Sequence, residues 1–294
     1  MTDAPPPRRP APDDEGLHAP GPEELWNESY YFDGVSDDLS LGVYARFGRL
    51  PNRDECVYSA CVCGPGRPTV MLVGTENIEF KQQCERPLEL FTLTVAGEGE
   101  VFEDPSAVLR GEGGPPSQVQ LALRFETDGV PYSWSRATRY EIPCRVTGTV
   151  RVGAEKIEFA GPGQRDHSWG HRDWWASDWM WSALHFEDGT HTHAVGVPQV
   201  PGFGVGYVQR GGELAEITAV EATEAVASNG LITEARIVSN PGGLDIAIEP
   251  LAFGPVLLTA PDGRIAHFPR AMCRARTTDG RTGSGWVEWN RNQR

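Results

Sequence analysis

Short β-prone runs separated by turn residues recur along almost the whole of this chain. Runs rich in Val, Ile, Thr and aromatic residues, such as Leu88–Val95 and Val119–Phe125, alternate with Gly, Pro, Asn and Asp at intervals of roughly 8–12 residues. The 34 Gly and 24 Pro leave little room for long helices. This punctuation predicts an all-β, mainly antiparallel protein. Only Val220–Ser228 is equally compatible with a helix.

The length of 294 residues and the Gly-rich breaks favour two β domains. We expect a disordered, Pro-rich terminus over residues 1–22. An N-terminal β domain is predicted over residues 23–155 and a C-terminal β domain over residues 156–294, because glycines cluster near 153–163.

The net charge of −15 argues against nucleic acid or an anionic membrane as a partner. No apolar run approaches the ~18–20 residues of a transmembrane helix, and the first residues lack the apolar core of a secretory signal.

Six cysteines without an export signal predict reduced, mostly buried thiols in a cytoplasmic protein. The Cys61-Val62-Cys63 pair lacks the spacing of a zinc knuckle. The oligomeric state is left open.

The segment 163–193 concentrates Trp169, Trp174, Trp175, Trp179 and Trp181 with five histidines. Buried Trp needs a partner for its N–H, and His titrates near neutral pH. The segment therefore suits the wall of a reactive, apolar-lined cavity. The simpler alternative is an aromatic core with hydrogen-bonded histidines and turn-locking ion pairs from the neighbouring Arg and Asp residues.

Strand alternation predicts which of these side chains share a face. His167 and Trp169 share one face if 165–175 is a strand, and Gly170 can host a bulge after them. Further on, Asp188-Gly189 predicts a two-residue hairpin that pairs Phe186 with His191. His191 and His193 would then stand on an apolar face, where unpaired imidazoles are costly to bury.

His, Asp and Trp around an apolar cavity suit acid-initiated chemistry on a hydrocarbon-like substrate. A buried acid with a raised pKa supplies a proton, and indole faces stabilise the resulting cation. We therefore predict a cofactor-independent hydratase, dehydratase, isomerase or cyclase for a small apolar molecule. In this hypothesis Asp173 or His167 donates the proton, Trp169 faces the cation, and His191 and His193 orient water.

Other residues are expected to bind the substrate or act as reserve acids. Two of them lie in the aromatic segments that open and close the folded region, where an edge strand with an exposed acid is the simpler interpretation. The set comprises Asp166, Trp175, Trp181, Phe186, Glu28 and Glu288.

Three alternative functions remain open. A non-catalytic binder of an apolar ligand needs the same cavity without converging titratable groups. A metal enzyme could use His191-Thr192-His193, completed by Glu187 and His167, although the Glu of a cupin site is missing. A sugar-binding surface would present Trp174, Trp175 and Trp179 in an exposed row. Walker A, Gly-x-Ser-x-Gly and dinucleotide-binding motifs are absent, and no cofactor is predicted.

The stretch Asp166-His167-Ser168-Trp169-Gly170, followed by Arg172-Asp173-Trp174, resembles the carotenoid 1,2-hydratase and AttH-like group of lipocalin-like proteins. The opening WNESYYFDGVSDDLSLGVYARFGRLPN is similar to the start of uncharacterised bacterial relatives of that group. The resemblance spans roughly residues 24–290. It implies two consecutive lipocalin-like β-barrel or half-barrel domains and hydration or cyclisation of isoprenoid or polyene substrates without metal or organic cofactor.

The resemblance also suggests site residues. The family's Asp-His-x-Trp element maps onto Asp166, His167 and Trp169, and its His and Trp are implicated in the active site. A downstream Tyr-x-Asp element of the hydratases falls near His191–Ala194. His191 and His193 stand there instead, so the family's carboxylic proton donor is missing at that place.

Overall fold

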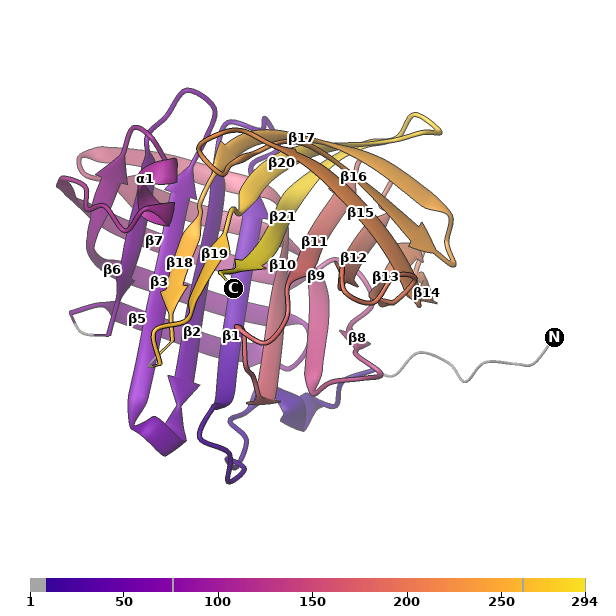
Figure 1. The fold of residues 1–294 in the computed structure, drawn as a ribbon, viewed down its shortest axis with the longest axis horizontal. Helices are drawn as coiled ribbons and strands as arrows, with labels where there is room; N and C mark the ends of the chain where they lie inside the picture. The colour runs from indigo at the N-terminus through magenta and orange to yellow at the C-terminus, as the bar shows by residue number, and fades with distance from the viewer. Residues whose placement is uncertain (1–8, 76, 261, 294) are drawn as a thin grey trace.

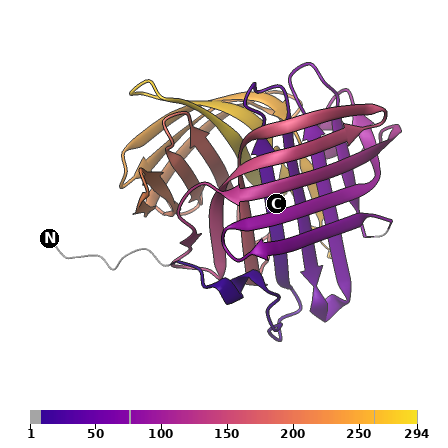
Figure 2. The ribbon, with the colours of Figure 1, turned by 180° about the vertical axis from the view of Figure 1, so that it is seen from behind.

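The computed structural model describes residues 9–75, 77–260 and 262–293. The all-β prediction is confirmed, with two antiparallel sheets and helices of a single turn (Figures 1 and 2). The first sheet consists of β1 (Trp26–Val35), β2 (Gly42–Leu50), β3 (Glu55–Cys63), β4 (Thr69–Gly74), β5 (Glu79–Arg86), β6 (Leu90–Phe102), β7 (Pro116–Thr127), β8 (Tyr132–Ser133), β9 (Arg139–Val152) and β10 (Glu155–His171).

The second sheet follows in the chain. It consists of β11 (Trp179–Phe186), β12 (His191–Gly196), β13 (Gly204–Arg210), β14 (Glu213–Ile217), β15 (Ala219–Val226), β16 (Ile232–Asn240), β17 (Leu244–Phe253), β18 (Val256–Thr259), β19 (Ile265–Phe268), β20 (Ala271–Thr277) and β21 (Thr282–Asn292). The short helices are η1 (Pro12–Glu15), η2 (Pro51–Arg53) and α1 (Ser106–Leu109). None of the helices in the described part of the chain is long and apolar enough to cross a membrane.

The first sheet closes into a barrel because the long strand β10 pairs with both β1 and β9. Closure leaves no free edge at this seam and buries one face of every strand in the barrel interior. Tyr30, Phe32, Leu93 and Phe125 are among the side chains that fill this interior. The second sheet stays open and arches beside the barrel, with β14 and β15 at its ends (Figure 1).

The first sheet ends at His171 and the second begins at Trp179. The border expected after residue 155 therefore coincides with the tight turn between β9 and β10, inside the first sheet. The Trp/His segment is divided between the two sheets as a result. Its first half completes the barrel, and its second half starts the open sheet.

The structure decides one open alternative in the second half of the chain and shows that one prediction there is wrong. The segment Val220–Ser228 lies mostly in strand β15 and forms no helix, because β16 pairs with it along its length. The hairpin after β11 has a three-residue loop, with Gly189 at φ +78° and the Phe186 N–H donated to the Thr190 carbonyl at 2.8 Å. A loop of this kind places its glycine in the left-handed region. The register shifts accordingly, and His191 pairs with His185 rather than Phe186.

The disorder expected up to residue 22 is also wrong for the described part of that segment, whereas residues 1–8 lie outside the described residues. Residues 9–22 form a strap across one end of the barrel (Figure 2). Glu15 is buried in this strap and forms an ion pair with Arg165 at 2.6 Å. Tyr30 donates a hydrogen bond to the Glu15 carbonyl at 3.0 Å. A buried ion pair is costly to break and therefore fixes the strap in place.

The outer face of the barrel packs against the second sheet. Tyr31, Tyr44, Trp181 and Trp286 belong to this inter-sheet core, and the Trp286 indole donates a hydrogen bond to the Gly34 carbonyl at 3.3 Å. All six cysteines are unpaired, and four are buried, as expected for reduced thiols. The cytoplasmic location stays a prediction.

Candidate active site

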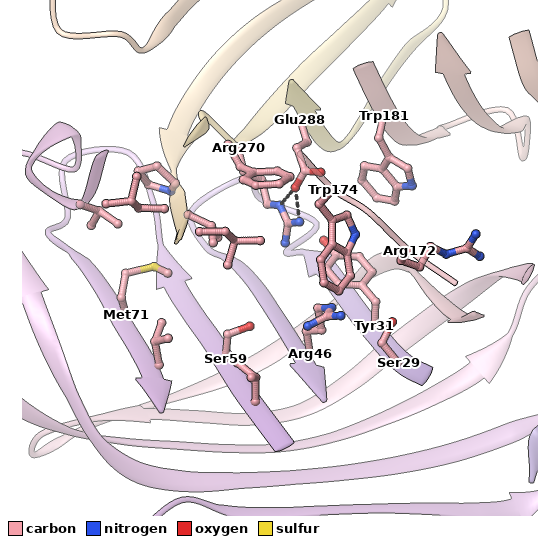
Figure 3. Close-up of a pocket in the computed structure, with 18 of the residues that line it drawn as sticks. Ser29, Tyr31, Arg46, Ser59, Met71, Arg172, Trp174, Trp181, Arg270 and Glu288 are labelled. Carbon is pink, nitrogen blue, oxygen red and sulfur yellow. Dashed lines mark hydrogen bonds and ion pairs between the residues drawn. The ribbon is translucent and has the colours of Figure 1, made fainter. Parts of the chain in front are cut away.

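A cavity of about 720 Å³ lies between the outer face of the barrel and the second sheet (Figure 3). Strand alternation explains its barrel-side wall, since Ser29 and Tyr31 of β1 share a face and lie opposite Ser168 and Asp166 of β10. The second sheet contributes a largely apolar wall with one ion pair. The lining residues from that side include Trp179, Trp181, Val195, Val256, Phe268, Arg270 and Glu288.

Asp166 is the titratable group best placed for proton transfer in this cavity. Its side chain is 4% exposed and accepts a hydrogen bond from Arg139 at 2.7 Å. Burial, together with the nearby Glu141 carboxylate, raises the pKa of Asp166 to about 7, although Arg139 and Arg46 oppose the shift. A carboxyl group with a pKa near neutrality can both donate and accept a proton.

A buried polar network holds Asp166 and Arg139 from behind. Glu141 is fully buried and accepts hydrogen bonds from Arg139 and, at 2.6 Å, from Gln164. Burial raises the pKa of Glu141 against the effect of Arg139. Gln164 in turn accepts a hydrogen bond from the Tyr207 hydroxyl of the second sheet at 3.0 Å. The network ties the two sheets together directly behind the acidic site.

The opposite wall carries a second ion pair. Arg270 donates to Glu288 at 2.6 Å, and both side chains line the cavity (Figure 3). The Arg270 guanidinium lies over the rings of Tyr31 and Tyr44, 5.0 and 4.4 Å from their centroids. Cation–π contacts of this kind fix a buried guanidinium in orientation.

Aromatic side chains line the part of the chamber beside Tyr31 and Arg46. Trp181 meets Tyr31 edge to face at 5.5 Å between ring centroids. Trp174, from the loop after β10, lies over Arg46 with 5.2 Å between the guanidinium carbon and the ring centroid. In Figure 3 the Trp174 indole stands in the middle of the cavity lining, above Arg46 and Tyr31. The chamber thus combines apolar walls with a few polar groups, as small-molecule sites do.

Four of the predicted site residues line this cavity. They are Asp166, Asp173, Trp181 and Glu288. Asp173 accepts hydrogen bonds from Arg264 at 3.2 Å and from the Trp175 N–H at 3.0 Å, so it locks the loop that carries Trp174. Its carboxylate is therefore engaged in holding that loop.

His167, Trp169 and Glu28 do not line the cavity, contrary to the prediction. They lie on the opposite face of the first sheet, at the strap end of the barrel interior. His167 is fully buried, with Nε2 3.0 Å from Glu28 Oε1 and Nδ1 2.8 Å from the Asp14 carbonyl. Trp169 stacks on His18 of the strap at 3.7 Å between centroids. The His167/Trp169 pairing on one face was correct, but that face is the barrel core.

The histidines of β12 lie behind the cavity wall rather than in it. His193 is fully buried between Trp134 and Trp181, with its Nδ1 3.0 Å from the Ser182 carbonyl. Its Nε2 is 3.3 Å from Glu141 Oε1 in an orientation that makes no hydrogen bond. Burial lowers the pKa of His193 well below its usual value, so the ring is neutral at pH 7.

The remaining predicted residues also lie outside the cavity lining. His191 Nδ1 is 2.9 Å from His185 Nδ1, and burial lowers the pKa of His191. Phe186 packs in the core of the second sheet. The Trp175 indole donates to the Leu258 carbonyl at 3.4 Å. Trp174 and Trp175 meet at 79°, so the tryptophans form no planar row for a sugar.

The described residues contain one group spaced to hold a metal ion, and it is not the His191/His193 pair. It consists of His18, Glu28 and His167. Both carboxylate oxygens of Glu28 already have hydrogen-bond partners, because the two imidazoles bond to Oε1 and the Arg49 guanidinium bonds to Oε2. Burial alone would raise its pKa, but these partners lower the pKa of Glu28 to about 2. The cluster of His18, Glu28 and His167 is therefore interpreted as a structural charge network.

Several lining residues escaped the sequence analysis. Arg46 and Arg139 belong to strands whose other residues are largely buried, and Tyr31 and Ser29 alternate with Tyr30 and Glu28 along β1. A polar side chain in an otherwise apolar strand was the available signal for Arg46. Nothing in the spacing indicated that the outer face, rather than the interior, borders a cavity.

A family model matches almost the whole of this chain. A model described as a domain of unknown function, DUF7064, matches residues 11–293. The chain belongs to this family. No curated protein matches the sequence.

Solved structures share the fold of this DUF7064 member at low sequence identity. A Nitrosomonas europaea protein assigned as AttH is 15% identical, with a TM-score of 0.62 and 95% coverage of each chain. CghA bound to Sch210972 is 11% identical, with a TM-score of 0.57 and coverage of 91% of this chain and 88% of that one. Kievitone hydratase from Nectria haematococca is 12% identical, with a TM-score of 0.56 and coverage of 90% and 88%. The AttH-like, lipocalin-like fold expected from the resemblance is supported by these likenesses.

Proposed function

We propose that this protein is an acid–base enzyme that hydrates, dehydrates or cyclises a small molecule in the inter-sheet cavity. The observation that carries the proposal is Asp166, a buried carboxyl group with a pKa of about 7 on the wall of a cavity of about 720 Å³. The hydratase among the structural neighbours supports this class of reaction.

Asp166 replaces His167 and Asp173 as the proposed proton carrier. His167 faces the barrel core, and Asp173 is engaged by Arg264 and by the loop it holds. Tyr31 lies opposite Asp166 in the β1–β10 pairing and lines the same cavity. A positioned acid or base contributes about 10²- to 10⁴-fold to a rate.

The apolar side chains of the chamber support a mainly hydrophobic substrate. Met71, Phe102, Trp181, Val195 and Phe268 supply much of the lining. An isoprenoid or polyene substrate, as the family resemblance implies, fits such walls. Catalysis without a cofactor remains part of this proposal, since Asp166 and water suffice for the chemistry.

The test uses the purified protein in H₂¹⁸O with β-ionone, farnesol and retinoate as probes. Mass spectrometry follows ¹⁸O uptake by hydration and water loss by dehydration. We expect turnover of at least one probe and a drop of about 100-fold or more in Asp166→Asn. Asp37→Asn, which removes an exposed carboxylate outside the cavity, is the matched control. Full activity in a folded Asp166→Asn variant, or no reaction with any probe, would overturn the proposal.

A further inference from the structure

Two arginines of the cavity lining lack a carboxylate partner among the described residues. Arg46 of β2 and Arg172 of the loop after β10 both line the chamber. Every other arginine of the lining is paired, since Arg139 bonds Glu141 and Asp166, and Arg270 bonds Glu288. Among the arginines of the lining, Arg46 and Arg172 are therefore the two that could bind an anionic ligand without breaking an ion pair of the described residues.

Arg46 is half-buried and makes weak polar contacts. Its Nη2 lies 3.5 Å from Asn27 Oδ1, at the limit of a hydrogen bond, and its guanidinium faces the Trp174 ring. Figure 3 shows the guanidinium directed from β2 towards Trp174 and Tyr31. Burial lowers the pKa of Arg46 to about 10, and Asp166 partly opposes this shift. The group remains a cation at neutral pH.

Arg172, on the loop after β10, lines the same cavity but points its guanidinium away from Arg46 (Figure 3). One of its nitrogens lies 3.4 Å from the Thr138 carbonyl. Burial lowers the pKa of Arg172 to about 10, Arg139 adds to the shift, and Asp166 opposes it. Arg46 and Arg172 thus both interact electrostatically with Asp166 and Arg139.

Arg46 and Arg172 are half-buried in the cavity lining. A partly desolvated guanidinium without a carboxylate partner is stabilised when a ligand supplies the negative charge. The cavity lining near Asp166 has four arginines, and Asp166 itself is largely protonated below pH 7. Developing negative charge on an oxygen would be stabilised there.

We propose that Arg46 forms an oxyanion subsite to which Arg172 adds positive charge from the loop after β10, and that the substrate carries a carboxylate or a comparably delocalised oxygen anion attached to its apolar body. This inference rests on the proposed function, because it names the substrate class of the same cavity. Arginine suits the task because its planar fork binds carboxylate oxygens in pairs. The subsite places the polar end of the substrate beside Asp166 and leaves its apolar part against the tryptophan wall.

The experiment compares two probes of the same shape by isothermal titration calorimetry at pH 6. trans-Cinnamate carries the carboxylate, and cinnamamide is its neutral analogue. We expect cinnamate to bind wild-type protein about tenfold or more tightly than the amide, as a charge-assisted hydrogen bond would give. Arg46→Gln should remove most of this preference and Arg172→Gln part of it, and both should leave the affinity for the amide similar.

The matched control is Arg124→Gln, which removes an exposed arginine outside the cavity lining and should keep the full preference. Arg46→Lys keeps the charge and should keep part of the preference. Arg172 lies on a loop, so its variant remains informative if Arg46→Gln does not fold. Equal affinities of the two probes for wild type, or a preference unchanged in both Gln variants, would overturn the subsite.

The result also separates this inference from the proposed function. Binding needs no turnover, so an intact carboxylate preference without turnover of any probe in H₂¹⁸O would contradict the enzyme and uphold the subsite. Turnover that depends on Asp166 without any carboxylate preference would contradict the subsite alone.

Discussion

Asp166 and His167 are consecutive residues of β10, yet their side chains lie on opposite faces of the first sheet. Asp166 lines the inter-sheet cavity, and His167 is sealed in the barrel beside Glu28. Both faces of this strand are buried, since all residues from Gly163 to Ser168 are buried. One short motif therefore supplies both the site and the charge network that closes the barrel.

The first prediction concerns the effect of pH on Asp166. Burial raises its folded pKa to about 7, above the unfolded value of 3.8, so the folded state holds this proton more tightly. The stability that Asp166 contributes is present below about pH 4 and is lost as pH rises to about 7. Asp166→Asn removes this titration. Between pH 4 and pH 7 the free energy of unfolding of the variant should therefore rise relative to wild type by up to about 1.4 kcal/mol per pH unit, and its melting temperature should rise with it.

Scanning calorimetry of both proteins at several pH values between 4 and 8 checks this expectation. Asp37→Asn corrects for the general effect of removing an acidic charge. A relative stability of Asp166→Asn that falls with rising pH would show that the carboxylate, rather than the acid, is favoured in the fold.

A second prediction concerns Glu28, which is fully buried with Arg49, His18 and His167 as partners. Glu28→Gln should lower the free energy of unfolding by about 3–5 kcal/mol, the usual loss on breaking a buried ion pair. Because its pKa falls from 4.5 to about 2, the stabilisation is complete above pH 4.5 and is lost as pH falls through 2. Urea unfolding at pH 7 and pH 3 measures both effects.

The control for Glu28 is Glu24→Gln, because the Glu24 side chain is 75% exposed and its pairing with Arg53 is a surface contact. It should change stability by less than about 1 kcal/mol. Equal effects of the two substitutions would mean that the barrel-end network adds no stability.

Strand alternation correctly grouped His167 with Trp169, and the β-prone runs separated by turn residues predicted the all-β fold. It could not predict which face of β10 borders a cavity, because the sequence of a strand buried on both sides is similar on either face. The hairpin register depended on one residue in the loop, and a shift of one residue exchanges the faces of all side chains in a strand. This is why His193 stands behind Trp181 rather than beside Leu184.

The long-range partners were also beyond sequence reasoning. Arg46 lines the site because β2 lies next to β1. Arg270 directly precedes β20 and lines the site from the second sheet, where it pairs with Glu288 of β21. Asp166, Trp181 and Glu288 were predicted because the Trp/His segment and the closing aromatic segment both carried visible signals. The strap was mistaken for disorder because its composition is polar, whereas its order comes from the ion pair of Glu15 with Arg165.

A third prediction concerns metal. Added Zn²⁺ should not raise the melting temperature, although His18, Glu28 and His167 are close enough to hold an ion. Both imidazoles bond the same carboxylate oxygen, and Arg49 occupies the other, so a cation would have to displace a guanidinium. A ligand that binds the folded state raises its stability. A rise that depends on added Zn²⁺ and disappears in His18→Ala would contradict this structural role.

The last prediction concerns the strap. Glu15 and Arg165 have side chains that are 4% and 2% exposed, and Glu15 also accepts hydrogen bonds from Tyr140 and from the Leu88 N–H. Glu15→Gln leaves a buried cation unpaired and should cost about 3–5 kcal/mol in urea unfolding, whereas Asp13→Asn, on the exposed side of η1, should cost less than about 1 kcal/mol. The double variant Glu15→Gln with Arg165→Gln should lose less stability than the two single losses combined, because it leaves no charge unpaired. Strict additivity of the two losses would show that the strap is held by its other contacts.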